Sequence, residues 1–408
     1  MEIFGDGELE RELQRSGPNG GGLLGWWRVF SETYEELIQS IAQPTRAEYA
    51  LSELGPTVLD LPDADGESVE VEREDIQLTN SRDERLECSF WRRKGDQQSD
   101  AAVPCVLYLH GMSSSRKESV YLRRKVLTSG FSLFALDFSG AGKSQGDRVS
   151  FGFFERDDVR VALDFLYATG KATRVAIWGR DIGAVAALLH LQDRFSYQYE
   201  TMELSADEMK AIEIVEDKGN NQLLCIRQSA GRLTFRMSKY SAQNGDFAVL
   251  AVDNEPYWDS LIPGEDTAAS QDQFVFALVA DNAYADMEQV IWDMLQMISK
   301  SAERRSLAIP GPMVTAVQKL LTNSIGRAGG YNLRDVGLLD AAPQFTLPCM
   351  FICASKKDFF TPDHTMALLE KYGGPKSFVQ FTGLVDDNRP DDVLDSVMNH
   401  FTERLKLL

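Results

Sequence analysis

Residues 174–190 read RVAIWGRDIGAVAALLH, and this stretch joins two hydrophobic patterns of different kinds. The first half, up to Gly179, is an apolar run that is typical of a strand buried on both faces. The second half, from Ala184, predicts a helix. Gly179 and Gly183 frame Asp181 between these elements, because glycines allow a tight turn that exposes its central side chain. We therefore expect Asp181 at the C-terminal edge of a sheet.

The same alternation of strand and helix continues on both sides of this stretch. Further buried strands are predicted at 103–111 and 131–140, and further strands of the same pattern at 273–282, 347–355 and 377–383. Helices are predicted at 119–130 and 155–170, from Met287 onward, and from Asp391 to the end. A hairpin with its turn at 80–83 precedes the first of the buried strands. Strands that alternate with helices predict an α/β fold with a mostly parallel sheet covered on both faces.

The remaining residues divide the chain into further regions. Residues 1–22 are charged and then glycine-rich, so we expect a flexible tail. Residues 23–43 predict an amphipathic helix, because apolar residues recur every three or four positions: Leu24, Trp27, Phe30, Tyr34, Leu37, Ile38 and Ile41. The α/β domain is expected at 44–194 and 273–408. The polar, strand-like residues 195–272 predict a β-rich insertion between its two parts.

The composition argues against several classes of partner and site. The chain has 408 residues and a net charge of -20, which disfavours a nucleic-acid backbone or an anionic membrane as the main partner. No apolar run approaches the roughly 18 residues of a membrane span. The five cysteines lack the paired spacing of a zinc site, so we predict no metal and reduced thiols. We also predict no cofactor and a cytoplasmic location.

Several motifs carry a family resemblance. They include PTRAEY (44–49), YLHGMSSSRKE (108–118), FALDFSGAGKSQG (134–146) and IWGRDIGAVAAL (177–188). With these motifs the chain resembles the α/β-hydrolases, in particular their serine-aminopeptidase-like and esterase-like branch, over about residues 43–400. The resemblance implies an α/β-hydrolase fold with its nucleophile elbow at Asp181. It also implies an oxyanion-side loop at His110, Gly111 and Met112, facing the backbone of Ile182.

The chain departs from this family at all three catalytic positions. The family's elbow reads G-R-S-M-G, and Asp181 stands at the place of the serine. Lys357 stands at the place of the acid. Residues 383–390 keep the frame of the family's G-D-H-N-S-x-R-P loop, with Val385 at the place of the histidine. A serine nucleophile needs a base, and the base needs an orienting acid, so this triad cannot function as the family's does.

Three hypotheses about function remain open. The first is a catalytically inert protein that acts as a scaffold or binds a protein partner or an apolar ligand. The second is a hydrolase of ester, amide or similar bonds that uses Asp181 as its nucleophile, with His364 as the outside candidate for its base. The third is a lid-bearing esterase with an unrecognised triad.

The insertion also leaves two alternatives open. Near its end, the sequence GDFAVLAVDN at 245–254 is similar to the G-D-x-I-x-x-V-N pattern near the end of PDZ domains. A divergent PDZ-like peptide-binding module and a plain β extension or lid are both compatible with the sequence. Neither alternative identifies a ligand, a partner or an oligomeric state.

Overall fold

The computed structural model describes most of the α/β domain and the strands of the insertion. The described residues are 34, 38–39, 41–62, 66, 68–94, 103–196, 212–217, 221–228, 231–242, 245–252, 255–260, 274–304, 311–356 and 362–408. For the strands between 212 and 260 only the backbone is described. Lys357 lies outside the described residues, as do residues 1–33.

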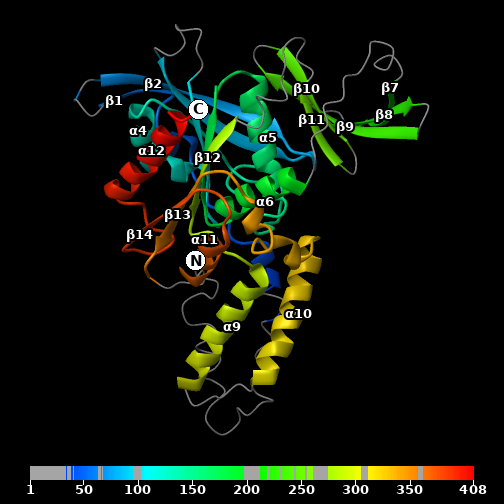
Figure 1. Cartoon of the computed structure of the whole chain (residues 1–408), viewed down its shortest axis with the longest axis vertical. Helices are drawn as coiled ribbons and strands as arrows, with labels where there is room; N and C mark the ends of the chain where they lie inside the picture. The colour runs from blue at the N-terminus through cyan, green and yellow to red at the C-terminus, as the bar shows by residue number, and fades with distance from the viewer. Residues whose placement is uncertain are drawn as a thin grey trace.

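A nine-stranded sheet forms the centre of the molecule (Figure 1), in the order β1-β2-β3-β5-β4-β6-β12-β13-β14. The strands are β1 (Val58–Pro62), β2 (Ser68–Thr79), β3 (Arg85–Arg93), β4 (Cys105–Leu109), β5 (Ser132–Leu136), β6 (Val175–Arg180), β12 (Val275–Asp281), β13 (Cys349–Ala354) and β14 (Lys376–Phe381). From β5 to β14 every neighbouring pair is parallel, whereas β1, β2 and β3 pair antiparallel. The predicted α/β fold and the hairpin with its turn after Thr79 are confirmed.

Helices cover both faces of the sheet. In β4, Cys105, Leu107 and Leu109 belong to one hydrophobic cluster, whereas Val106 and Tyr108 belong to another, as the two-residue period of a strand requires. The first cluster includes residues of α5 (Glu155–Ala168), α6 (Ile182–Ser196) and α11 (Pro362–Lys371). The second includes residues of α4 (Val120–Thr128) and α12 (Asp391–Leu405). Each face of the sheet is thus buried in its own core.

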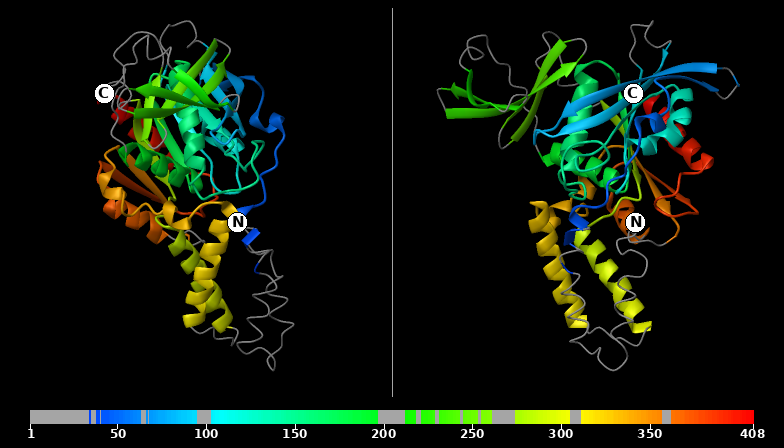
Figure 2. Two further views of the ribbon diagram at one scale, coloured as in Figure 1. Left: turned by 90° about the vertical axis from the view of Figure 1, so that its right-hand side faces the viewer. Right: turned by 180° about the vertical axis from the view of Figure 1, so that it is seen from behind.

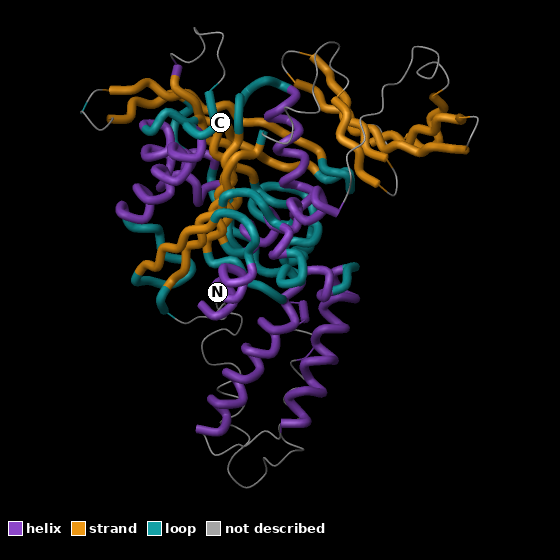
Figure 3. The backbone as a smooth tube through the Cα atoms, viewed as in Figure 1, coloured by secondary structure: helices purple, strands orange, loops and turns teal. Residues whose placement is uncertain are grey.

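Two long helices extend away from the sheet. They are α9 (Met287–Arg304) and α10 (Gly311–Gly329), which pack on each other after β12 (Figure 1). Figure 3 shows that loops gather between this pair and the sheet. We predicted a helix from Met287 but did not predict α10. Its signal was present, because Val314, Val317, Leu321 and Ile325 recur at helical spacing and are buried.

The residues after α6 form a second sheet. Five antiparallel strands, in the order β11-β10-β9-β8-β7, stand apart from the nine-stranded sheet in Figure 1 and in the right-hand view of Figure 2. They are β7 (Ile212–Asp217), β8 (Asn221–Gln228), β9 (Gly231–Ala242), β10 (Gly245–Val252) and β11 (Glu255–Ser260). These strands agree with the predicted β-rich insertion, whereas its likeness to a PDZ domain stays a prediction.

Only the end of the predicted N-terminal helix is described. Ile38 and Ile41 are buried in the main core, and the Tyr34 hydroxyl donates to Ser324 Oγ of α10 at 2.7 Å. This part of the predicted apolar stripe therefore docks on the chain's own α/β domain. Leu24, Trp27, Phe30 and Leu37 lie outside the described residues. Among the described residues no helix is long and apolar enough to cross a membrane, and the cytoplasmic location stays a prediction.

Candidate functional site

Asp181 occupies a strained turn between β6 and α6. Its φ of 51° lies in the left-handed region, which aspartate enters more readily than most residues. The turn is tight because a Cβ on Gly179 would lie 2.5 Å from the Gly183 carbonyl oxygen, and one on Gly183 would collide with the Leu109 carbonyl. The Asp181 N–H donates to the Asp281 carbonyl of β12 at 2.7 Å. The elbow geometry predicted for Asp181 is therefore present.

The Asp181 carboxylate lies on one of the backbone groups that we assigned to the oxyanion side. Its Oδ2 accepts a hydrogen bond from the Met112 N–H at 3.1 Å. Its Oδ1 is buried and has no hydrogen-bond partner in the described part of the chain. Burial raises the pKa of Asp181 to about 7, although the Met112 N–H opposes this rise. A carboxylate thus occupies the donor that an oxyanion would need.

The other oxyanion-side residues surround this carboxylate. A Cβ on Gly111 would be 3.8 Å from Asp181 Oδ2, and the buried Ile182 begins α6 directly after Asp181. His110 is held by backbone on both ring nitrogens. Its Nε2 accepts from the Phe138 N–H at 3.1 Å, so the proton is on Nδ1, which donates to the Gly111 carbonyl at 2.7 Å. These two hydrogen bonds hold His110 to the backbone of Gly111 and Phe138, so His110 is not a base for Asp181.

The loop that carries Val385 is fastened by two buried arginines. Arg180 Nη2 donates to the Val385 carbonyl at 2.5 Å, and Arg389 Nη2 donates to the same oxygen at 3.0 Å. Arg389 also forms a two-pronged ion pair with Asp281, at 2.8 and 2.9 Å. The Val385 side chain belongs to the hydrophobic cluster that α12 covers. Asp386, one residue later, has the charge that acts on Asp181 and helps to raise its pKa.

His364 pairs with a residue other than Asp181. It is buried at the start of α11, and its Nε2 lies 3.3 Å from Asp293 Oδ2 of α9. Burial lowers the pKa of His364 and the charge of Asp293 opposes this, so the imidazole is neutral at pH 7. The remaining histidines lie within helices, His190 in α6 and His400 in α12. The structure therefore brings Asp181 together with Gly111, Met112 and Ile182, and it pairs His364 with a different carboxylate.

Three residues of the site were missed by sequence reasoning: Tyr284, Asp281 and Asp386. Burial and then the Asp181 charge raise the pKa of Tyr284, whose hydroxyl donates to the Phe151 carbonyl at 2.6 Å. Asp281 anchors Arg389. One signal was available, because Asp281 is a carboxylate at the C-terminal end of an otherwise apolar strand. Asp386 could not be recognised, since only the fold brings it near a residue 205 positions earlier.

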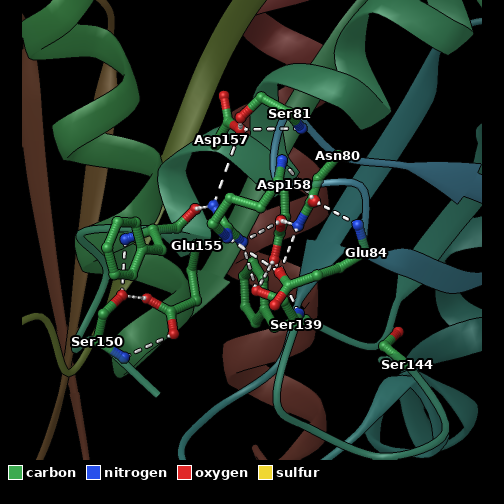
Figure 4. A network of polar contacts seen from close by, with 12 residues as sticks. Asn80, Ser81, Glu84, Ser139, Ser144, Ser150, Glu155, Asp157 and Asp158 are labelled. Atoms are coloured by element: carbon green, nitrogen blue, oxygen red, sulfur yellow. Dashed lines mark hydrogen bonds and ion pairs between the residues drawn. The ribbon is translucent and has the colours of Figure 1, made fainter. Parts of the chain in front are cut away.

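A second polar network fixes the loops beside the site (Figure 4). It joins the β2–β3 turn to the start of α5. The buried Asp158 of α5 accepts from Asn80 Nδ2 and from the Ser139 N–H, both at 2.8 Å. Glu155 accepts from the N–H groups of Ser150 and Gly152, at 2.8 and 2.9 Å. The bonds of Glu155 hold the backbone on both sides of Phe151, whose carbonyl accepts a hydrogen bond from the Tyr284 hydroxyl.

Comparisons with known proteins bear on the fold of the chain. Residues 100–216 match the family model of serine aminopeptidases, S33, which is less than half of the chain. The structure is similar to an esterase of Pyrococcus furiosus, with 13% identity, a TM-score of 0.50, and coverage of 89% of this chain and 98% of that one. An esterase of Exiguobacterium antarcticum shares 14% identity, with a TM-score of 0.39 over 84% of this chain and 98% of its own. No curated protein sequence matches.

The order of the strands, the elbow at Asp181 and the likeness to the Pyrococcus esterase lead to the same assignment. The family match covers β4, β5 and β6 and the helices between and after them, which is the part of the chain that contains the elbow. The chain is therefore a protein of the α/β-hydrolase fold, with its likeness to the serine aminopeptidases limited to residues 100–216.

Proposed function

We propose that this chain is a catalytically inert protein of the hydrolase fold that binds a ligand or a partner protein without hydrolysing it. The observation that carries the proposal is the hydrogen bond from the Met112 N–H to the Asp181 carboxylate. Acyl transfer creates a negative oxygen that such N–H groups stabilise. Here a carboxylate takes that place, and its charge would repel the developing oxyanion.

The missing base supports the same proposal. His110 is bonded to backbone on both nitrogens, and His364 lies against Asp293. Loss of one member of a catalytic triad already costs about four to six orders of magnitude in rate. Removal of one oxyanion donor costs a further factor of about 10² to 10³. These losses together would reduce hydrolysis by a serine-type mechanism to background.

Restoration of the triad tests the proposal. We expect no fluorophosphonate labelling and no hydrolysis of p-nitrophenyl esters by the natural chain or by Asp181→Ser alone. Activity should first appear when Asp181→Ser and Lys357→Asp are combined with a histidine in the loop after β14. This histidine should be placed at position 385 in one variant and at position 386 in another. Val385 has the family's histidine position, but its side chain packs under α12, so Val385→His tests that position. The charge of Asp386 acts on Asp181, so Asp386→His tests the neighbouring position.

The control for this experiment is Asp181→Ala, which removes the elbow carboxylate but supplies no hydroxyl. If the natural chain hydrolyses an ester and Asp181→Ala abolishes this activity, the proposal of a catalytically inert protein is refuted. It would support the alternative, a hydrolase centred on Asp181. One observation favours that alternative: a buried carboxyl with a pKa of about 7, and with one oxygen that has no partner among the described residues, is suited to proton transfer at neutral pH.

A further inference from the structure

Asp181 has a buried carboxylate oxygen that no described residue satisfies. The residue is 3% exposed, and Oδ1 has no hydrogen-bond partner in the described part of the chain. An unsatisfied buried polar atom destabilises the folded state, more so when it is charged, so each such atom calls for an explanation. We propose that Asp181 Oδ1 binds the ammonium group of an amine ligand whose remaining part is apolar.

The neighbouring donors are committed to other acceptors. The Met112 N–H is used by Oδ2, and the Tyr284 hydroxyl donates to the Phe151 carbonyl. His110 donates its one ring proton to the Gly111 carbonyl. The described residues therefore offer no further donor here, and a ligand that enters the site would supply one to Oδ1.

The charges around Asp181 favour a cation over a neutral donor. Arg180 is next to Asp181 in the sequence, but its Nη1 forms an ion pair with Glu118 Oε1 at 2.7 Å. The Nη2 of Arg180 donates to the Val385 carbonyl. Glu118 thus offsets the charge of the nearest arginine. Asp386 adds a further negative charge that acts on Asp181. A ligand ammonium would compensate this excess and form a charge-assisted hydrogen bond, which is about twice as strong as a neutral one.

The rest of the ligand should be apolar. Met112, Ile182 and Tyr284 are all buried, and the first two belong with Tyr284 to the same hydrophobic cluster. Polar groups on the ligand would lose their hydration there without gaining partners. Because Asp181 is 3% exposed, a ligand reaches it only when neighbouring side chains move apart, so we expect slow association.

Calorimetric titration of the full chain with n-butylamine tests this inference, with n-butanol as the neutral ligand of the same shape. We expect one molecule of butylamine to bind at pH 8 and no binding of butanol. At pH 5.5 most of the Asp181 carboxyl is protonated, so the apparent affinity should fall on the order of thirtyfold. Asp181→Asn should abolish binding. Asp60→Asn, an exposed carboxylate on the far edge strand β1, should leave it unchanged.

A second measurement covers the case in which Asp181→Asn does not fold. Butylamine should lower the pKa of Asp181 in the natural chain, followed through the carboxyl carbon by NMR. Equal binding of butanol, or unchanged binding by a folded Asp181→Asn variant, would overturn the inference. It rests on the proposed function, but the two can fail separately. If the chain neither binds butylamine nor hydrolyses esters, only the proposed ligand class is refuted. If the chain hydrolyses esters, the proposed inert function is refuted.

Discussion

At the scale of single residues, Asp181 shows how a catalytic turn can persist without its chemistry. The left-handed conformation is kept because glycines at 179 and 183 leave room for the turn and because aspartate tolerates a positive φ. The side chain then accepts a hydrogen bond from the Met112 N–H of the loop after β4. Geometry and reactivity are thus separable at this position.

The same residue predicts a pH dependence of stability. Burial raises the pKa of Asp181 to about 7 in the folded state, whereas an unfolded aspartate titrates near 3.9. Between these values the folded state binds a proton that the unfolded state does not, so this residue's contribution falls as pH rises through that window. Asp181→Asn should therefore stabilise the chain at pH 8, by an amount on the order of a few kcal/mol, and much less at pH 4. Urea unfolding at both pH values measures this, and an equal effect at both would contradict it.

At the scale of elements, the loop between β14 and α12 depends on one buried ion pair. Arg389 and Asp281 are both fully buried, and Arg389 also fastens the Val385 carbonyl. Arg389→Met would leave Asp281 without its main counter-charge, which costs about 3–5 kcal/mol. The matched control is Arg334→Met, whose pair with Glu288 is exposed and should cost at most about 1 kcal/mol. Similar losses in urea unfolding for the two variants would argue against this role of Arg389.

Elements with one dominant pattern were predicted from the sequence, and those with a mixed pattern were not. β4, β5 and β12 are apolar except for Ser132 at the start of β5 and Asp281 at the end of β12, so burial on both faces could be inferred. β1 was missed because its residues, VLDLP, include an aspartate and a proline and alternate only weakly at the sheet edge. The elbow was predictable because its glycines are four residues apart. The link between Arg389 and Asp281, 108 residues apart, depends on tertiary packing that no local pattern encodes.

At the scale of the whole molecule, the two sheets are independent in their hydrogen bonding. Among the described residues, each of the strands β7 to β11 pairs only with its neighbours in sequence, so no described strand of the other sheet is needed to complete this one. The nine-stranded sheet passes directly from β6 to β12, with Val175 opposite Val275. The chain thus leaves the main sheet after α6 and returns at β12 without interrupting it.

This independence predicts the result of removing the insertion. Replacement of residues 197–273 by a Gly/Ser linker leaves every strand pair of the nine-stranded sheet in place. The shortened chain should therefore unfold in one cooperative transition in urea, followed by near-UV circular dichroism, with a smaller denaturant slope because less surface is exposed. It should also keep the affinity of the natural chain for n-butylamine, since Asp181, Met112 and Tyr284 all lie outside the insertion. A chain that is insoluble, or that loses its tertiary signal without a cooperative transition, would show that the insertion is part of the main fold.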